Sequence, residues 1–179
     1  MNRSPERRGD PGPACYPQPA LLDLPIPQQY RCGVTLPDLD TDGALPLGIH
    51  LATWDEVVAF FGGTAHRAEL LAGLLDVLRD LQRAGCRTAY LDGSFVTDKE
   101  VPGDYDLCWD MDAVDLSKLH PVILDVDVPR AAQKARYRGD ILPNVTEGSS
   151  GAPFVEFFQR NKVTGGVKGI VAINLEELV

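Results

Sequence analysis

The stretch of sequence that decides the fold is YLDGSFVTDKEVPGDYDLC, residues 90–108. An apolar segment enters a glycine–serine pair, Gly93 and Ser94, and two aspartates, Asp104 and Asp106, begin ten residues after the serine. A Pro-Gly dipeptide directly before the aspartates favours a tight turn. We therefore expect a strand that ends at the glycine–serine pair, a polar loop, and a second strand that carries the aspartates and pairs with the first.

The segments around this hairpin predict helices before it and a mixture of helix and strand after it. The sequence TWDE fits a capping box with Thr53 as the N-cap residue, and the pair Gly62-Gly63 ends that helix. Leucines at helical spacing then predict a long amphipathic helix between Thr64 and Gly85.

The remaining elements are predicted from apolar alternation and turn residues. One short strand is expected within 29–52, and the other predictions are a basic helix at 130–140 and strands at 87–91, 105–109, 153–159 and 169–175. This order predicts an α/β (α+β) fold, a mixed sheet flanked by helices.

Composition predicts one folded domain preceded by an arm. Residues 1–28 are rich in proline, which fixes φ and removes a backbone donor, so we expect a flexible arm there and a single domain at 29–179. The chain has 179 residues, 44% hydrophobic and 24% charged, as in an ordinary soluble globular protein.

Charge and cysteine content narrow the function classes. The net charge of −9 argues against an extended nucleic-acid interface, which needs clustered lysine and arginine. The four cysteines form no CxxC pair and are interpreted as free thiols of a reducing compartment. The sequence has neither an apolar run long enough to span a membrane nor a secretory signal, so we expect a cytoplasmic protein.

The polar residues of the hairpin are suited to nucleotide chemistry. Two aspartates separated by one residue on a strand point to the same face, where both can contact one metal ion. Gly93 allows close approach to the backbone, and Ser94 offers a hydroxyl and an amide to a phosphate oxygen. The structural alternative is that Asp104 and Asp106 only solvate a turn, since this acidic chain also contains the sequences DMD at 110–112 and DVD at 125–127.

The same residues carry a resemblance. LDGSF followed by DYDL resembles the polymerase-beta-like nucleotidyltransferase superfamily, especially its minimal members, which combine a Gly-Ser pair with two aspartates on the next strand. The stretch 90–110 and the tail FFQRNKVTGGVKGIVAIN also resemble a bacterial family of uncharacterised nucleotidyltransferase-like proteins. The resemblance covers roughly residues 48–175 and implies a nucleotidyltransferase-like fold that uses Mg²⁺ or Mn²⁺ with a nucleoside triphosphate as substrate.

The resemblance implies roles for particular residues. Asp104 and Asp106 would hold the metal, and a third carboxylate on a later strand would complete the cluster or deprotonate the acceptor. Our first choice for it is Glu156, because we place it in the middle of a strand; Asp125 and Asp127 are second. The expected nucleotide-binding residues are Gly93, Ser94, Lys99, Arg130 and Lys134; the last two share one helical face, which is also typical of a solvated surface.

Two function classes follow. The first is a metal-dependent nucleotidyltransferase that moves a nucleoside monophosphate to an unknown acceptor (a protein, an RNA or a small molecule), in the context of a toxin–antitoxin or defence module. The second is a non-catalytic interaction module with the same fold, an antitoxin or regulatory subunit, whose proline-rich arm binds a protein partner. The position of the third carboxylate discriminates between them.

Overall fold

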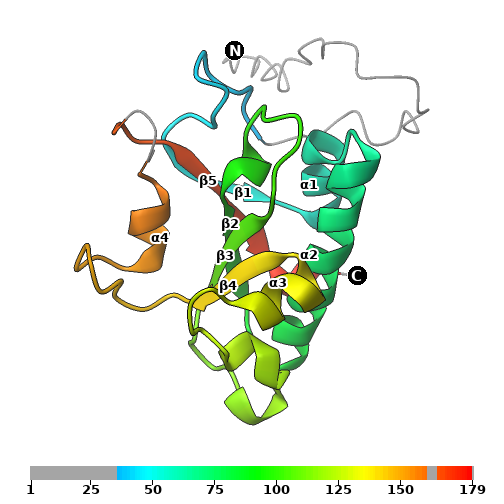
Figure 1. The fold of residues 1–179 in the computed structure, drawn as a ribbon, viewed down its shortest axis with the longest axis vertical. Helices are drawn as coiled ribbons and strands as arrows, with labels where there is room; N and C mark the ends of the chain where they lie inside the picture. The colour runs from blue at the N-terminus through cyan, green and yellow to red at the C-terminus, as the bar shows by residue number, and fades with distance from the viewer. Residues whose placement is uncertain (1–35, 161–164, 179) are drawn as a thin grey trace, which may run out of the picture. The chain divides into compact units, whose positions relative to one another are not determined.

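The computed structural model describes residues 36–160 and 165–178, and these build one mixed sheet with helices on both faces (Figure 1). The sheet order is β1-β5-β2-β3-β4, with strands β1 (Gly48–Ala52), β2 (Thr88–Asp92), β3 (Tyr105–Trp109), β4 (Gly139–Pro143) and β5 (Gly169–Asn174). The pairs β1–β5 and β3–β4 are parallel, whereas β5–β2 and β2–β3 are antiparallel. The predicted α/β fold with a mixed sheet is therefore confirmed.

Two helices before the hairpin cover one face of the sheet. Helix α1 (Trp54–Phe61) begins with the predicted capping box: Thr53 Oγ1 accepts from Glu56 N at 3.3 Å, and Glu56 Oε2 accepts from Thr53 N at 2.7 Å. Helix α2 (Ala65–Arg83) presents its leucine stripe to the core, where Leu74 and Leu78 are fully buried. The apolar faces of these helices exclude water from this side of the sheet.

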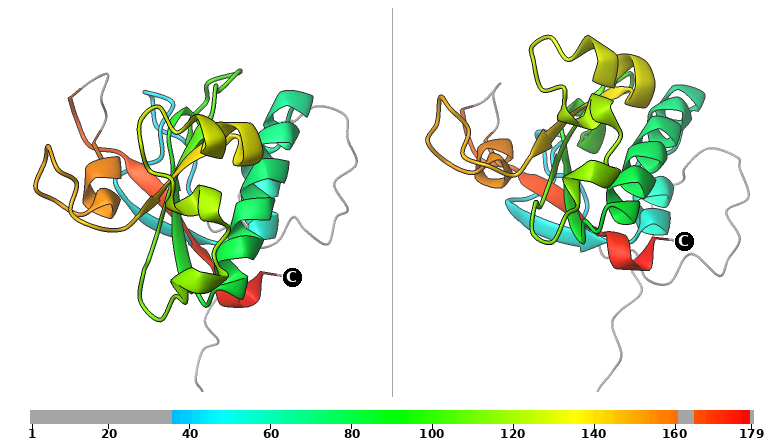
Figure 2. Two further views of the ribbon diagram at one scale, coloured as in Figure 1. Left: turned by 60° about the horizontal axis from the view of Figure 1, so that its bottom comes forward. Right: turned by 90° about the horizontal axis from the view of Figure 1, so that it is seen from below.

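The opposite face of the sheet is covered in part by one short helix. Helix α4 (Phe154–Phe158) packs Phe158 against Cys108 and Ile170, with Tyr90 partly buried beside them. Figure 2 shows α4 on one side of the sheet and α1 and α2 on the other. The rest of this second face, toward the start of β3 and β4, carries polar side chains.

Helix α3 (Ala131–Tyr137) lies against α2 and β4 (Figure 1). Its fully buried Gln133 accepts a hydrogen bond from Ile141 N at 2.8 Å and donates to Ile141 O at 2.9 Å and to Ile123 O at 3.3 Å. The side-chain amide thus satisfies both backbone groups of a residue in β4, which fixes α3 on that strand.

Several predictions about elements are confirmed. The paired strands at 88–92 and 105–109, the last strand, the short strand before α1 and the helix at 131–137 are all present. Cys86 and Cys108 are free thiols, as expected, and both are buried. Among the described residues, no helix is long and apolar enough to cross a membrane. The predicted arm at 1–28 lies outside the described residues.

The strand predicted at 153–159 is wrong, because these residues form α4. Phe154, Phe157 and Phe158 have the i, i+3, i+4 spacing of one helical face, and Pro153 is the N-cap residue. The sequence predicts that the basic helix continues to residue 140 and therefore does not predict strand β4; the helix ends at Tyr137, with Arg138 at φ 69° as its C-cap. The sheet therefore gains its fourth strand in chain order before α4.

Candidate functional site

Three aspartates lie side by side across neighbouring strands. In the register of the sheet, Asp92 at the end of β2 is the partner of Asp106 in β3, and Asp106 is the partner of Asp140 in β4. Directly paired residues present their side chains on the same face, with Cβ atoms roughly 5 Å apart. Asp104, two residues before Asp106, has the spacing of the same face. We call these four residues the acidic row.

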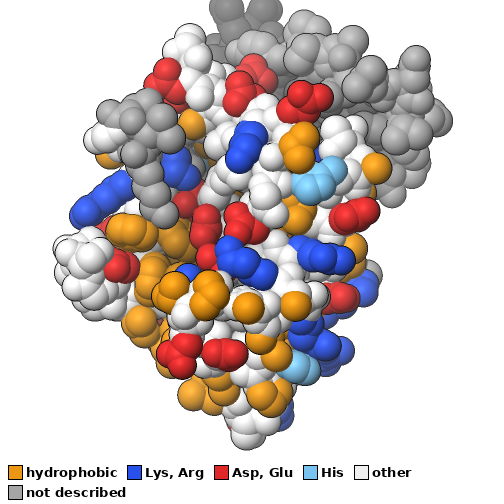
Figure 3. Space-filling model, viewed as in Figure 1, with side chains coloured by type: hydrophobic (Ala, Val, Ile, Leu, Met, Phe, Trp, Pro, Cys, Tyr) orange, Lys and Arg blue, Asp and Glu red, His pale blue; other side chains and the backbone are white. Residues whose placement is uncertain are grey.

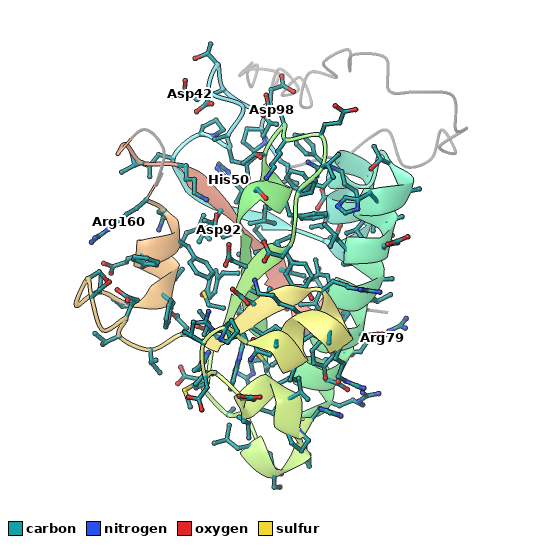
Figure 4. The ribbon with its side chains drawn as sticks, viewed as in Figure 1. Asp42, His50, Arg79, Asp92, Asp98 and Arg160 are labelled. Carbon is teal, nitrogen blue, oxygen red and sulfur yellow. The ribbon has the colours of Figure 1, made fainter. Side chains whose placement is uncertain are left out.

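The acidic row lies on the face of the sheet that carries α4. Cys108, which is two residues after Asp106 in β3 and therefore on the same face, packs against Phe158 of α4. Figure 4 shows Asp92 between the strands and α4, and Figure 3 shows acidic side chains gathered near the middle of this surface, beside basic and apolar ones. The row thus has charged neighbours on one side and an apolar rim on the other.

The glycine of the Gly-Ser pair is required by the acidic row itself. Gly93 has φ 88° and ψ −171°, a conformation that essentially only glycine adopts. A Cβ built at Gly93 would lie 2.6 Å from Asp106 Oδ2 and 3.0 Å from Asp106 N. The turn after β2 therefore packs directly on the second aspartate of the pair, and Ser94, which begins a 3-10 helix (Ser94–Val96), follows at once.

Arg130 and Lys134, predicted to share one helical face, both contact the acidic row, although Arg130 is the N-cap residue before α3. Lys134 Nζ forms an ion pair with Asp104 Oδ2 and lies 3.2 Å from Asp140 Oδ1. Arg130 lies one turn earlier, and its Nη1 is 3.4 Å from Asp140 Oδ2. The hydrogen bond to Asp104 raises the pKa of Lys134, with Asp140 as a further cause. Lys134 thus remains a cation that bridges β3 and β4.

A second lysine neutralises the other end of the row. Lys168, just before β5, pairs with Asp92 Oδ1, and the side chains are only 12% and 8% exposed. Burial of a charge costs free energy unless the charge is paired, so this pair stays together as long as the site is closed to water. Since Asp92 directly precedes Gly93, the ammonium group of Lys168 is fixed next to the Gly-Ser turn.

The loop between the two motifs is held by the first turn of α2. The buried guanidinium of Arg67 donates to Phe95 O at 2.8 Å, Thr97 O at 2.8 Å, Lys99 O at 2.6 Å and Phe61 O at 3.3 Å. His66 Nε2 lies 2.6 Å from Pro102 O. Burial lowers the pKa of Arg67, and nearby Asp98 opposes that change. The loop is therefore a fixed structure rather than an open connection.

A polar network anchors α4 beside the acidic row. Tyr90 Oη donates to Asp110 Oδ2 at 3.0 Å, and Asn144 Nδ2 donates to Asp110 Oδ1 at 2.9 Å. Asn144 Oδ1 in turn accepts from Val155 N in α4 at 3.2 Å. Burial, followed by the hydrogen bond to Asp110, raises the pKa of Tyr90 to about 12. Tyr90 is consequently neutral at physiological pH and acts as a donor that orients Asp110.

The structure brings together most of the predicted site residues but not the predicted third carboxylate. Glu156 is exposed on α4, so the reason for choosing it, a place in a strand, is wrong. Asp125 and Asp127 are exposed in the connection before α3. Lys99 is exposed as well, and it contacts Arg67 through its backbone carbonyl.

Sequence reasoning missed Asp92, Asp140 and Arg67. The signal for Asp140 is its position at the start of a short apolar segment, Ile141-Leu142, after the helix; that segment was too short to be recognised as a strand. Asp92 stands directly before the Gly-Ser pair, one residue after the predicted strand at 87–91, and no spacing pattern in the sequence links it to Asp104 and Asp106. Nothing in the sequence indicates that Arg67 points inward.

The donor set of the acidic row suits a hard divalent cation, since carboxylate oxygens are the ligands that Mg²⁺ prefers. Asp140 Oδ1 is buried and, among the described residues, accepts no hydrogen bond, with Lys134 as its nearest cation. No group of three or more His, Cys, Asp or Glu in the described ranges is already arranged to hold a metal ion. The residue types therefore fit a metal, and Lys134 would have to move for the carboxylates to bind one.

Fold and site together define a mixed α/β domain with an ion-paired acidic row at one end of its sheet. The chain belongs to a family whose model matches residues 37–174 and whose description is "Family of unknown function (DUF6932)". The matched residues include the whole acidic row and its basic partners. Neither a curated protein nor a solved structure matches the chain.

Proposed function

We propose that this protein is a metal-dependent nucleotidyltransferase that transfers a nucleoside monophosphate from a nucleoside triphosphate to a hydroxyl or phosphate acceptor. The observation that carries the proposal is the register of the sheet, which sets Asp140 beside Asp106 and therefore supplies a third carboxylate on a strand adjacent to the pair of aspartates. The candidate third carboxylate is thus Asp140 in place of Glu156.

Each part of the site has a role in this reaction. Asp104, Asp106 and Asp140 would hold the divalent cation, which when bound neutralises charge that develops on the transferred phosphoryl group. Ser94 and the backbone at Gly93 offer donors to the remaining phosphate oxygens. Arg130, together with Lys134 and Lys168, would balance the negative charge of the polyphosphate.

Calorimetry with ATP, GTP, CTP and UTP in the presence of Mg²⁺ or Mn²⁺ tests the proposal. We expect binding to wild type, loss of binding in Asp104→Asn/Asp106→Asn and in Asp140→Asn, and wild-type binding in the matched control Glu156→Gln. Absence of binding of every nucleotide by the folded wild-type protein would refute the proposal. Labelled nucleotide would then identify the acceptor class, including protein and RNA acceptors of a toxin–antitoxin or defence module.

A second candidate function is favoured by a specific observation. The carboxylates of the row are ion-paired with lysines of the same chain, as in a site that uses them for structure. The protein would then be a non-catalytic interaction module, an antitoxin or regulatory subunit, that has retained the fold. Under this alternative the three asparagine substitutions change the free energy of unfolding, no nucleotide binds, and a protein partner is the ligand to seek.

A further inference from the structure

Lys134 occupies a position that a metal-binding site would need for itself. Its ammonium group contacts the carboxylates of Asp104 and Asp140 at once, on two neighbouring strands. Arg130 contacts the other carboxylate oxygen of Asp140, at 3.4 Å, from the preceding turn of the polypeptide. The oxygens that would coordinate a divalent cation are thus already shared with cations of the protein.

The charges of the site show that the protein's own cations oppose the entry of a metal ion. Among the described residues, Arg130, Lys134 and Lys168 form ion pairs with aspartates of the acidic row, so three positive charges of the protein already lie at the site. A divalent cation that entered without other change would meet an ammonium group within a few ångströms, and like charges at that distance repel strongly. Entry of the cation therefore requires that an ammonium group leave.

Lys134 is the cation that can leave at low cost. Its side chain is 39% exposed, whereas the side chain of Lys168 is 12% exposed and that of Arg130 is 20% exposed. The long, flexible lysine stem lets the ammonium group swing to another anion while the helix stays in place. A polyphosphate beside the carboxylates would be such an anion.

We propose that Lys134 is a displaceable counter-ion, which holds Asp104 and Asp140 together in the metal-free protein, yields them to a divalent cation, and transfers its charge to the polyphosphate that accompanies the cation. This inference rests on the proposed function, because it takes the acidic row to be a metal site. It adds that the cation and the polyphosphate bind cooperatively. The polyphosphate draws the ammonium group of Lys134 away from the carboxylates, and the cation frees that ammonium group to pair with the polyphosphate. Each ligand therefore raises the affinity for the other by the same factor.

The test measures metal binding rather than activity. Free Mn²⁺ is followed by its electron paramagnetic resonance signal during titration of the protein, and a preformed complex of Mn²⁺ with inorganic tripolyphosphate is titrated by calorimetry. The variants are Lys134→Gln, which removes the charge, and Lys134→Arg, which keeps it. Lys118→Gln is the matched control, since Lys118 is also ion-paired with an aspartate, Asp115, but lies in the connection between β3 and α3.

The expected results separate the variants. Wild type binds Mn²⁺ alone weakly and the tripolyphosphate complex at least about tenfold more tightly, in keeping with the usual size of such coupling. Lys134→Gln binds Mn²⁺ alone about tenfold more tightly than wild type, because the competing charge is gone. In Lys134→Gln the ratio between the affinity for the tripolyphosphate complex and the affinity for free Mn²⁺ is smaller than in wild type. Lys134→Arg and Lys118→Gln have the affinities of wild type.

Two outcomes would overturn the inference, and they differ in whether the proposed function also fails. If Mn²⁺ binds wild type and is lost in Asp104→Asn/Asp106→Asn, but Lys134→Gln binds it no more tightly, the inference falls and the proposed function stands. If neither Mn²⁺ nor the complex binds to any folded variant, the proposed function and the inference fall together. Since Lys134 is partly exposed, both of its variants are expected to fold, which thermal unfolding checks.

Discussion

Removal of the Arg67 guanidinium should destabilise the protein more than any change of a surface charge. Its side chain reaches four backbone carbonyls, three of them, at Phe95, Thr97 and Lys99, in the loop between the Gly-Ser pair and the aspartates. Hydrogen bonds from a charged donor contribute about 1.5–3 kcal/mol each, but carbonyls near the surface recover part of this from water. We therefore expect Arg67→Ala to lower the free energy of unfolding by about 3–5 kcal/mol.

Urea unfolding followed by the fluorescence of Trp54 and Trp109 measures this loss. The matched control is Arg79→Ala, an exposed arginine of the same helix that points away from the sheet (Figure 4), for which a change within about 0.5 kcal/mol is expected. Amide hydrogen exchange should become faster in residues 95–99 before it does in the core. A loss below about 1 kcal/mol for Arg67→Ala would refute the reasoning, because the carbonyls would then be satisfied without the guanidinium.

Three further results are expected. Gly93→Ala should lower the free energy of unfolding by about 2–4 kcal/mol, because Gly93 has a positive φ and the new Cβ would meet the carboxylate of Asp106. The control is Gly103→Ala, in the same loop with open space around it, which should change the free energy of unfolding little in the same urea titration. Gln133→Leu should cost about 2–4 kcal/mol and speed amide exchange in β4, since two buried backbone groups lose their partners; unchanged exchange there would contradict the assignment. Burial raises the pKa of Cys86 to about 11 and that of Cys108 higher still, so both thiols stay protonated and unreactive toward a disulfide reagent at pH 8. Labelling should accelerate only as the pH rises toward 11 or when denaturant is added. The variant Cys15→Ser/Cys32→Ser removes the signal of the other two cysteines.

The parts of the fold that the sequence predicts well are those with a local physical signal. The capping box at Thr53 works through two hydrogen bonds within four residues, and the hairpin of β2 and β3 depends on a glycine and a tight turn between two apolar segments. Such signals need no knowledge of distant residues. Asp104 and Asp106 could be chosen as candidate site residues for the same reason.

The parts that could not be predicted depend on long-range pairing. Asp140 joins the acidic row only because β4 pairs in parallel with β3, after a connection that contains α3. The ion pair of Lys168 with Asp92 joins residues far apart in sequence, and Arg67 is buried because a loop closes over it. The apolar residues of 153–159 fit both the alternation of a strand and the spacing of a helix. The segment is too short for its sequence to distinguish the two, so packing on the sheet decides which one forms.

The side chain of Gln133 also has a consequence for association between molecules. Strand β4 is an edge of the sheet, and an edge normally presents unpaired backbone groups to which a foreign strand can bind. At Ile141 both of those groups are already bonded to a buried amide, so another chain would have to displace α3 before it could extend the sheet there. The edge next to Asp140 is therefore protected against aggregation by strand addition.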